Sequence, residues 1–184
     1  MNRAKFFTSV RSSLFGGKLE NSEVAGCEAV INAFEAAGLT NSQWLAYMLS
    51  TSFHETAGTM QPIGEYGKGR GREYGRPAGP FNKVYYGRGF VQLTWLDNYK
   101  RAEDELGAPF VADPELALDP KHAADIMIKG MTQGWFTGKR LAQYFGSKND
   151  PVNARRIING TDKANLIAGY YEKFLKAINE AHAG

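Results

Sequence analysis

The sequence predicts a mainly α-helical protein with little or no sheet. Apolar residues recur at helical spacing in several segments, and three Asp-Pro pairs, at positions 113–114, 119–120 and 150–151, suit helix starts. Between the helical patterns, residues 64–89 hold eight glycines and two prolines, which is typical of a loop. A chain of 184 residues is long enough to bury one sizeable core. We therefore expect a single domain over residues 1–184.

The first two predicted helices lie before residue 60. One begins at Ser22 and stops at Gly38, with an apolar face formed by Val24, Cys27, Ile31 and Phe34. The next begins at Thr40, which stands in capping-box spacing with a glutamine, and its end carries His54 and Glu55. Its inward residues are predicted to be Trp44, Leu45, Met48, Leu49 and Ser52.

Three more helices are predicted after the glycine-rich segment, which we expect to be an ordered loop with room for a short hairpin. One begins at Asp97 and stops at Gly107, the second follows Pro120, and the third begins near Asp162. Their inward residues are predicted to be Tyr99, Ala102, Leu106, Ala124, Met127, Ile128, Met131, Leu166, Ile167, Tyr170, Phe174 and Ile178.

Composition excludes several classes of protein. The chain is 43% apolar and 22% charged, and it has no run of the roughly 18 apolar residues that a membrane span needs. The net charge of +3 favours approach to an anionic surface but does not require nucleic acid. With three histidines and one cysteine, we expect no zinc site and no cofactor, and we expect Cys27 to pack as a small apolar residue.

The N-terminal stretch MNRAKFFTSVRSSLFGGKL is basic, but Ser, Arg and Thr interrupt its apolar residues. It does not contain the continuous apolar region of a secretory signal. We therefore expect a protein made in a cytoplasm, which needs another factor to reach a substrate outside the membrane.

Three glutamates, Glu55, Glu65 and Glu73, fall in one window of the sequence. Cleavage of a glycosidic bond needs one carboxylic acid and a second carboxylate. Glu55 follows an apolar helix, whose walls would favour the protonated form, whereas Glu65 lies in a polar loop and would stay ionised. Paired glutamates are also common on solvated surfaces, and His54 is interpreted as support for the geometry of the site.

The glycine-rich segment allows other interpretations. The run GKGRGREYGR has the interleaved Arg, Gly and Tyr of an RNA-binding tract, although acids at positions 65 and 73 flank it and the overall charge is nearly balanced. Aromatic residues in and around the segment provide either stacking platforms for sugars or part of the core. They are Tyr66, Tyr74, Tyr85, Tyr86 and Trp95.

The runs HETAGT, YYGRGFVQLTWLDNY and RRIINGTD resemble glycoside hydrolase family 19, which contains the plant-type chitinases and many phage endolysins. The family's His-Glu-Thr, its Tyr-Tyr-Gly-Arg-Gly followed by Gln-Leu-Thr, its Asn-Tyr and its Ile-Asn-Gly all occur here in order. The similarity covers roughly residues 40–165. It implies a lysozyme-like, two-lobed α+β domain with a catalytic cleft, and inversion at the anomeric carbon.

The resemblance also implies roles for particular residues. Glu55 matches the general acid, and Thr94 matches the residue that helps to hold the attacking water. The family's short bacterial members place the second glutamate one position earlier, where this chain has Gly64, so we assign the general base to Glu65 and keep Glu73 in reserve. Residues expected to bind substrate or shape the cleft are His54, Tyr86, Arg88, Gln92, Asn98 and Asn159.

The sequence thus predicts a phage-type endolysin, a single catalytic domain without a separate wall-binding module. It would act as a monomer on β-1,4 bonds of peptidoglycan, with no cofactor, no nucleic acid and no stable membrane association. The host would lyse once a separate protein had permeabilised its membrane. The alternatives are a chitinase acting on chitin oligosaccharides, a catalytically inactive wall-binding protein, and a nucleic-acid-binding module.

Overall fold

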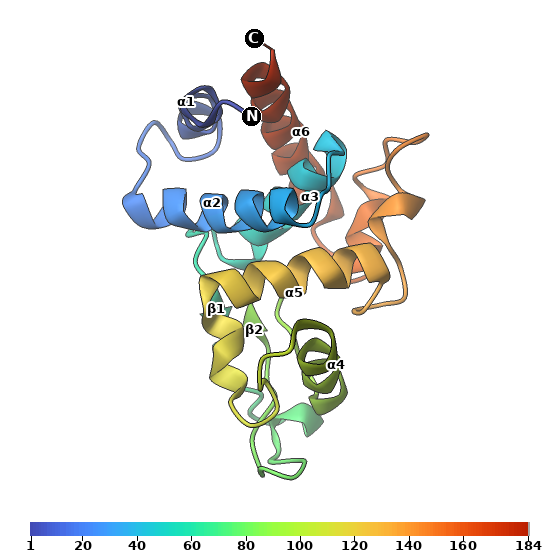
Figure 1. The fold of residues 1–184 in the computed structure, drawn as a ribbon. Coiled ribbons are helices and arrows are strands. Elements are labelled where there is room, and N and C mark those ends of the chain that lie inside the picture. Colours follow the sequence, from blue (N-terminus) through green and yellow to red (C-terminus); the bar gives the residue numbers. More distant parts are fainter. Residues whose placement is uncertain (184) are drawn as a thin grey trace.

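The computed structural model describes residues 1–183, and these form six α-helices and one two-stranded sheet (Figure 1). The helices are α1 (Arg3–Ser13), α2 (Asn21–Ala36), α3 (Ser42–Glu55), α4 (Leu96–Leu106), α5 (Pro120–Gln133) and α6 (Ala164–His182). Strands β1 (Ile63–Gly64) and β2 (Arg88–Gly89) pair antiparallel. Four short 3-10 helices are η1 (Glu73–Gly75), η2 (Pro114–Leu118), η3 (Leu141–Gln143) and η4 (Asn153–Ile157). The predicted mainly α class is confirmed.

The elements form two groups on either side of α5. Helices α1, α2, α3 and α6 pack together with η4 and are called the helical lobe. The loop lobe consists of β1, η1, β2, α4 and η2. Figure 1 shows α5 between the two lobes, and it contacts α2 and α3 on one side and β2, α4 and η2 on the other. The two lobes of the predicted architecture therefore share one helix.

The two early helices begin at other residues than the sequence indicated. Helix α3 is capped by Asn41, not Thr40, and the Asn41 Oδ1 accepts backbone N–H groups at 2.9 and 3.2 Å. Helix α2 is capped by Glu20, whose backbone N–H donates to the Glu23 carboxylate at 2.7 Å, and Ser22 lies inside its first turn. In each case a side chain near the observed start accepts hydrogen bonds from N–H groups at that end of the helix, so the start lies one or two residues from the predicted cap.

The Asp-Pro pairs start three different structures. Asp119 caps α5 as predicted, with its Oδ1 accepting from Lys121 N at 3.0 Å. Asp113 precedes only the 3-10 helix η2, and Asp150 closes a turn by accepting from Asn153 N at 3.1 Å. Proline at the first position fits the first turn of an α-helix or a 3-10 helix. An Asp-Pro pair therefore predicts where a helix starts but not how long it is.

Helix α1 is absent from the predicted elements. Only Phe6 and Val10 on it are fully buried, so its apolar pattern is too sparse to indicate a helix. The helix is held in place by tertiary contacts: Arg3 donates to Glu28 at 3.0 Å and to Glu35 at 2.8 Å on α2. These charged hydrogen bonds lower the pKa of the Glu35 carboxyl below its usual range.

The core contains most of the residues predicted to face inward. Exceptions are Leu166, which is 46% exposed, and four residues that are partly exposed: Val24, Trp44, Leu106 and Tyr170. Cys27 is completely buried as predicted, and its burial raises the pKa of the thiol. No helix within residues 1–183 is both apolar enough and long enough to span a membrane.

One close backbone contact fixes the chain that follows α3. A Cβ atom added to Gly26 of α2 would lie 1.7 Å from the carbonyl oxygen of Met60. Met60 is fully buried and has φ +54°. Because backbone atoms cannot give way as a flexible side chain can, only glycine fits at position 26. The contact sets the path of the segment that connects Glu55 to Glu65.

We predict that Gly26→Ala lowers the free energy of unfolding by about 3 kcal/mol, because the added methyl group overlaps the Met60 carbonyl. Chemical denaturation monitored by circular dichroism measures this. The control is Gly169→Ala, in α6 with no atom within 4 Å of the new Cβ, which should raise stability by about 0.5–1 kcal/mol. Equal effects of the two changes would contradict the packing argument.

Candidate active site

Glu55 is the last residue of α3, and its side chain is 17% exposed. Its Oε1 accepts a hydrogen bond from Arg155 Nη1 at 2.7 Å, and the Arg155 side chain is only 3% exposed. The Nε of Arg155 donates to the carbonyl of Asp162 at 2.9 Å. Two separate segments of the helical lobe thus hold one carboxyl group in a fixed orientation, since charge-assisted hydrogen bonds are short and directional.

This arrangement corrects the expected surroundings of Glu55. The sequence argument placed it among apolar walls, but its hydrogen-bond partner is a buried cation. Arg155 was not among the predicted site residues. It lies 100 positions away, and although the run RRIINGTD contains it, no spacing rule connects that run to the end of α3.

Glu65 follows β1 directly and is held through both carboxylate oxygens. Oε1 accepts from the Tyr74 hydroxyl at 2.9 Å, and Oε2 accepts from the Gly87 N–H at 3.2 Å. Glu73, the reserve base, is exposed, and within residues 1–183 its carboxylate has no hydrogen bond or ion pair. The structure therefore orders Glu65 and leaves Glu73 in solvent, which favours Glu65 as the general base.

Gly87 is the point at which Glu65 meets two other predicted residues. A Cβ atom on Gly87 would lie 2.8 Å from Gln92 Oε1 and 3.3 Å from Thr94 Oγ1. Thr94 is in turn linked to Asn98, whose Nδ2 donates to the Thr94 carbonyl at 2.9 Å. The structure thus brings Glu65, Gln92 and Thr94 together around one glycine, and Asn98 is joined to them through Thr94.

The backbone next to these side chains is in an unusual conformation. Gln92 has φ +57° and Trp95 has φ +76°, values that residues with a side chain rarely adopt. The conformation is held by hydrogen bonds from Gln92 Nε2 to the Ile63 carbonyl at 3.0 Å and from Trp95 N to the Tyr85 carbonyl at 2.9 Å. Such strain is concentrated at functional sites, where it aims particular side chains.

Tyr86 and Arg88 lie beneath the surface, with 8% and 3% exposure. Arg88 Nη1 donates to the Tyr99 hydroxyl at 3.0 Å and the Val84 carbonyl at 3.1 Å, and Nη2 pairs with Glu115 at 2.8 Å. Its guanidinium carbon lies 3.6 Å from the centroid of the Tyr86 ring. These two residues were expected to bind substrate or to shape the cleft, and their burial favours the second role, because from there they support the backbone of the loop lobe.

His54 and Asn159 belong to the helical lobe. His54 is partly exposed and lines a pocket of about 440 Å³ with Phe53, Ala57, Gly58 and Tyr170. Asn159 is exposed two residues after the end of η4, and its N–H donates to the Arg155 carbonyl at 2.9 Å. Asn159 therefore shares a segment with the partner of Glu55.

The predicted stacking residues fall into two groups. Tyr85 and Tyr86 are buried, whereas Tyr66 is fully exposed and Trp95 is 49% exposed. Tyr74 packs edge-on against Trp95, with ring centroids 5.3 Å apart. Because Tyr74 also donates to Glu65, the exposed aromatic residues border the predicted base and suit contact with sugar rings.

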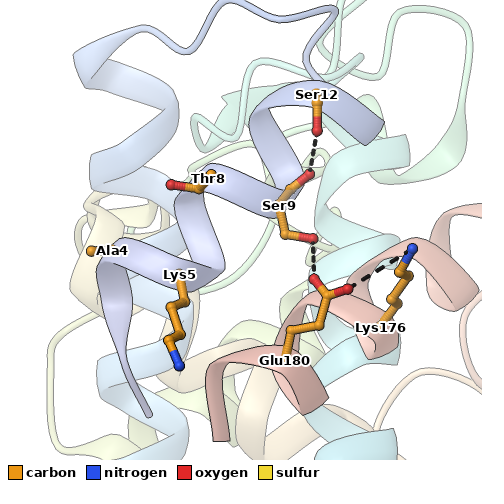
Figure 2. A pocket seen from close by; sticks show the side chains of 7 residues that line it. All are labelled: Ala4, Lys5, Thr8, Ser9, Ser12, Lys176 and Glu180. Atoms are coloured by element: carbon orange, nitrogen blue, oxygen red, sulfur yellow. Dashed lines mark hydrogen bonds and ion pairs between the residues drawn. The ribbon is translucent and has the colours of Figure 1, made fainter. Parts of the chain in front are cut away.

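A larger pocket lies elsewhere, between α1 and α6, with a volume of about 570 Å³ (Figure 2). The Ser9 hydroxyl donates to the Glu180 carboxylate at 2.8 Å, and Lys176 pairs with the same carboxylate at 3.8 Å. Both contacts are drawn in Figure 2. The pocket is lined by none of the predicted site residues, so we do not place the active site there. Within residues 1–183, no cluster of three or more His, Cys, Asp and Glu side chains is arranged to hold a metal ion.

We predict that His54 titrates with a pKa below the ordinary value of about 6.5, because partial burial opposes its charged form more than Glu55 favours it. In Glu55→Gln the favourable carboxylate is lost while Arg155 remains, so the midpoint should fall further. NMR titration of the imidazole protons, assigned with His54→Gln, measures both. An unchanged or higher midpoint in Glu55→Gln would contradict the proximity of the two groups.

Comparison with known proteins shows similarity to chitinases. No family model matches the chain. An acidic endochitinase of Petunia hybrida is 31% identical over 179 residues, covering 88% of this chain and 67% of that enzyme. An acidic endochitinase of Dioscorea japonica is 32% identical over 108 residues, covering 53% of this chain and 41% of that enzyme. The chain spans between 32% and 67% of the length of the curated relatives that it matches.

Solved structures show the same similarity. A bacterial family 19 chitinase superposes with a TM-score of 0.66 at 26% identity, covering 96% of this chain and 93% of that one. Chitinase C of Streptomyces griseus superposes with a TM-score of 0.60 at 24% identity, covering 97% of this chain and 75% of that one. At that identity the second likeness concerns the fold alone.

Proposed function

The chain belongs to glycoside hydrolase family 19 and is a glycosidase that hydrolyses O-glycosyl bonds, and from this premise we propose that it is an endolysin. In this proposal it cleaves β-1,4 bonds between the amino sugars of bacterial peptidoglycan. The observation that carries the proposal is the pair of ordered carboxyl groups, Glu55 held by Arg155 and Glu65 held by Gly87 and Tyr74.

The two carboxyl groups have different tasks in an inverting hydrolysis. Glu55 donates its proton to the oxygen that leaves the anomeric carbon, and Arg155 then stabilises the carboxylate that remains. Glu65 accepts a proton from a water molecule, whose oxygen attacks the anomeric carbon from the opposite face. The Thr94 hydroxyl, which reaches the same glycine as Glu65, orients that water. One water is consumed: its hydroxyl group stays on the anomeric carbon, and the leaving oxygen keeps the proton from Glu55. The proton that Glu65 took from the water returns to Glu55 through solvent.

Gln92, Asn98 and Asn159 supply amide groups for the hydroxyl and acetamido groups of the sugars. Gln92 and Asn98 adjoin Thr94 in the loop lobe, and Asn159 follows Arg155 in the helical lobe. Binding on both sides of the scissile bond would hold the sugars between the two carboxyl groups. Such positioning contributes to the rate because the reacting groups no longer need to find one another.

Peptidoglycan and chitin share the β-1,4-linked amino-sugar backbone, so the two carboxyl groups alone do not determine which of these polymers is the substrate. The names of the relatives favour chitin oligosaccharides, which are the second candidate substrate. The positive net charge of +3 favours peptidoglycan, because its peptides carry carboxylates and chitin is uncharged.

The biological setting is part of the same proposal. The protein would accumulate in the cytoplasm of an infected bacterium and act as a monomer. It would reach the wall after a separate protein had permeabilised the membrane, and hydrolysis would then lyse the host.

We predict that Glu55→Gln and Glu65→Gln each lower kcat by about 10²- to 10⁴-fold, since each removes one proton transfer. Glu73→Gln is the matched control and should retain nearly full activity, because its carboxylate is exposed and without partners among residues 1–183. Initial rates on a soluble oligosaccharide measure the effect, and circular dichroism checks the fold. Loss of activity in Glu73→Gln with retention in Glu65→Gln would move the base to Glu73.

We predict that digestion of purified peptidoglycan releases fragments with new reducing ends at an amino sugar, identified by mass spectrometry. Chitin oligosaccharides should be cut more slowly at equal molar concentration of bonds. Cleavage of chitin alone would identify a chitinase. Binding to the wall without cleavage of either polymer would identify the inactive wall-binding alternative.

A further inference from the structure

The segment formed by residues 64–87 is a cationic surface, which we call the cationic segment. Its five basic side chains are all exposed: Lys68, Arg70, Arg72, Arg76 and Lys83. None of them forms an ion pair or a side-chain hydrogen bond with any part of the chain that the structure describes. Outside the segment, Lys121 and Lys176 pair with carboxylates on their own helices, whereas Arg11, Lys148 and Lys173 are exposed cations without an ion pair within residues 1–183 that are scattered over the surface. The cationic segment therefore gathers five accessible cations, free of partners among the described residues, in one stretch of the surface.

The surplus charge of the protein is concentrated here. The segment holds five of the 22 basic residues and two of the 19 acidic ones, so its charge of +3 equals that of the whole chain. The remaining residues balance one another. A local excess of one sign raises the concentration of oppositely charged groups beside it, an effect that salt weakens.

The backbone of the segment is folded into successive turns. The N–H groups of Lys68, Arg70 and Arg72 each donate to the carbonyl three positions earlier, at 3.0, 2.9 and 2.9 Å. A Cβ atom on Gly75 would lie 1.8 Å from the carbonyl oxygen of Gly69, so the two ends of this run are in close contact. The cations are thus presented from an ordered backbone, and a ligand would not have to order the loop.

The cationic segment also borders the catalytic base. Tyr74, in the middle of the segment, donates to Glu65 at 2.9 Å and packs against Trp95. Tyr66, the next residue after Glu65, is fully exposed. A glycan whose scissile bond lies at Glu65 would therefore carry its substituents to the arginines.

We propose that the cationic segment binds carboxylates of the peptide stems of peptidoglycan and so makes the enzyme prefer peptidoglycan to uncharged amino-sugar polymers. The inference rests on the proposed function of the adjoining site. Arg70, Arg72 and Arg76 suit this task because a guanidinium binds a carboxylate with two parallel hydrogen bonds. Glycines separate Lys68, Arg70 and Arg72, which leaves each cation accessible to a separate carboxylate.

A nucleic acid fits these observations less well. A phosphate backbone needs a continuous track of positive charge, and here the track is confined to one segment that also contains Glu65 and Glu73. The charges of the rest of the chain cancel. Single carboxylates on short peptides can be bound by the few cations of the cationic segment alone.

The test compares two forms of one substrate: peptidoglycan with its peptides, and the same glycan strands after an amidase has removed them. In the stripped strands, the muramic acid carboxylates that the amidase frees are converted to methylamides, so that the strands carry no charge. The variant carries Arg70→Gln, Arg72→Gln and Arg76→Gln together. Its kcat/KM should fall about tenfold on intact peptidoglycan, through KM, and stay at the wild-type value on the stripped strands, as expected for a few exposed ion pairs. Raising the salt concentration should reduce the wild-type preference for intact peptidoglycan and should change that of the variant less, because only Lys68 and Lys83 remain in its segment.

A matched control removes the same charge elsewhere. Arg11→Gln, Lys148→Gln and Lys173→Gln change three exposed cations outside the segment and should leave both rates unchanged. Replacing the same three arginines by lysines keeps the charge without the paired hydrogen bonds, and should restore part of the lost kcat/KM. Thermal unfolding checks that all variants fold.

Several results would overturn the inference while the proposed function stands. These are an equal loss on both substrates, no loss on either, or the same loss in the control variant. Retention of the wild type on single-stranded RNA at about 0.15 M salt, lost in the variant with no change in hydrolysis, would identify a nucleic-acid surface instead. Failure of the wild type to cut either glycan would overturn the proposed function itself.

Discussion

The loop lobe is organised around the buried guanidinium of Arg88. It donates to the carbonyls of Val84 and Tyr86 and to the hydroxyl of Tyr99, and it pairs with Glu115, so one cation joins the approach to β2, helix α4 and η2. Removing a charge from water costs several kcal/mol unless its hydrogen bonds are replaced, and here they are. The loop that contains Gly87 is fixed by these bonds, and through Gly87 so is the carboxylate of Glu65.

The helical lobe has a counterpart in Arg155, which is equally buried but acts directly on a carboxyl group. Each lobe thus orders one of the two glutamates by means of a buried arginine. Arg155 contacts Glu55 directly, whereas Arg88 acts on Glu65 through the backbone at Gly87. Helix α5 packs against both lobes, so it fixes the position of one acid relative to the other. The proposed hydrolysis depends on that relation, because in an inverting mechanism the acid and the base must reach opposite sides of one sugar bond.

The sequence predicted features that follow from local rules. Helical spacing located α3 and therefore Glu55 at its end, and the Asp119-Pro120 pair located the start of α5. Glycine content predicted the loop that carries Glu65. Contacts between distant segments could not be predicted: Arg155 meets Glu55 across 100 positions, and α1 depends on its partners more than on its own apolar residues. The motif around Arg88 indicated the loop that contains Gly87, Gln92 and Thr94. It could not indicate that Arg88 itself would be buried and would hold the backbone of that loop.

Backbone strain is unevenly distributed in this molecule. Of the seven non-glycine residues with positive φ in the described part of the chain, six lie between residues 57 and 95, and Gln92 and Trp95 are among them. Each such conformation costs on the order of 1 kcal/mol or more. Substitution by glycine would relieve the cost at Gln92 but would also delete its amide. Substitutions that relieve strain between residues 57 and 95 would therefore lower activity. We expect thermostable variants to gain their stability from substitutions in the helical lobe instead.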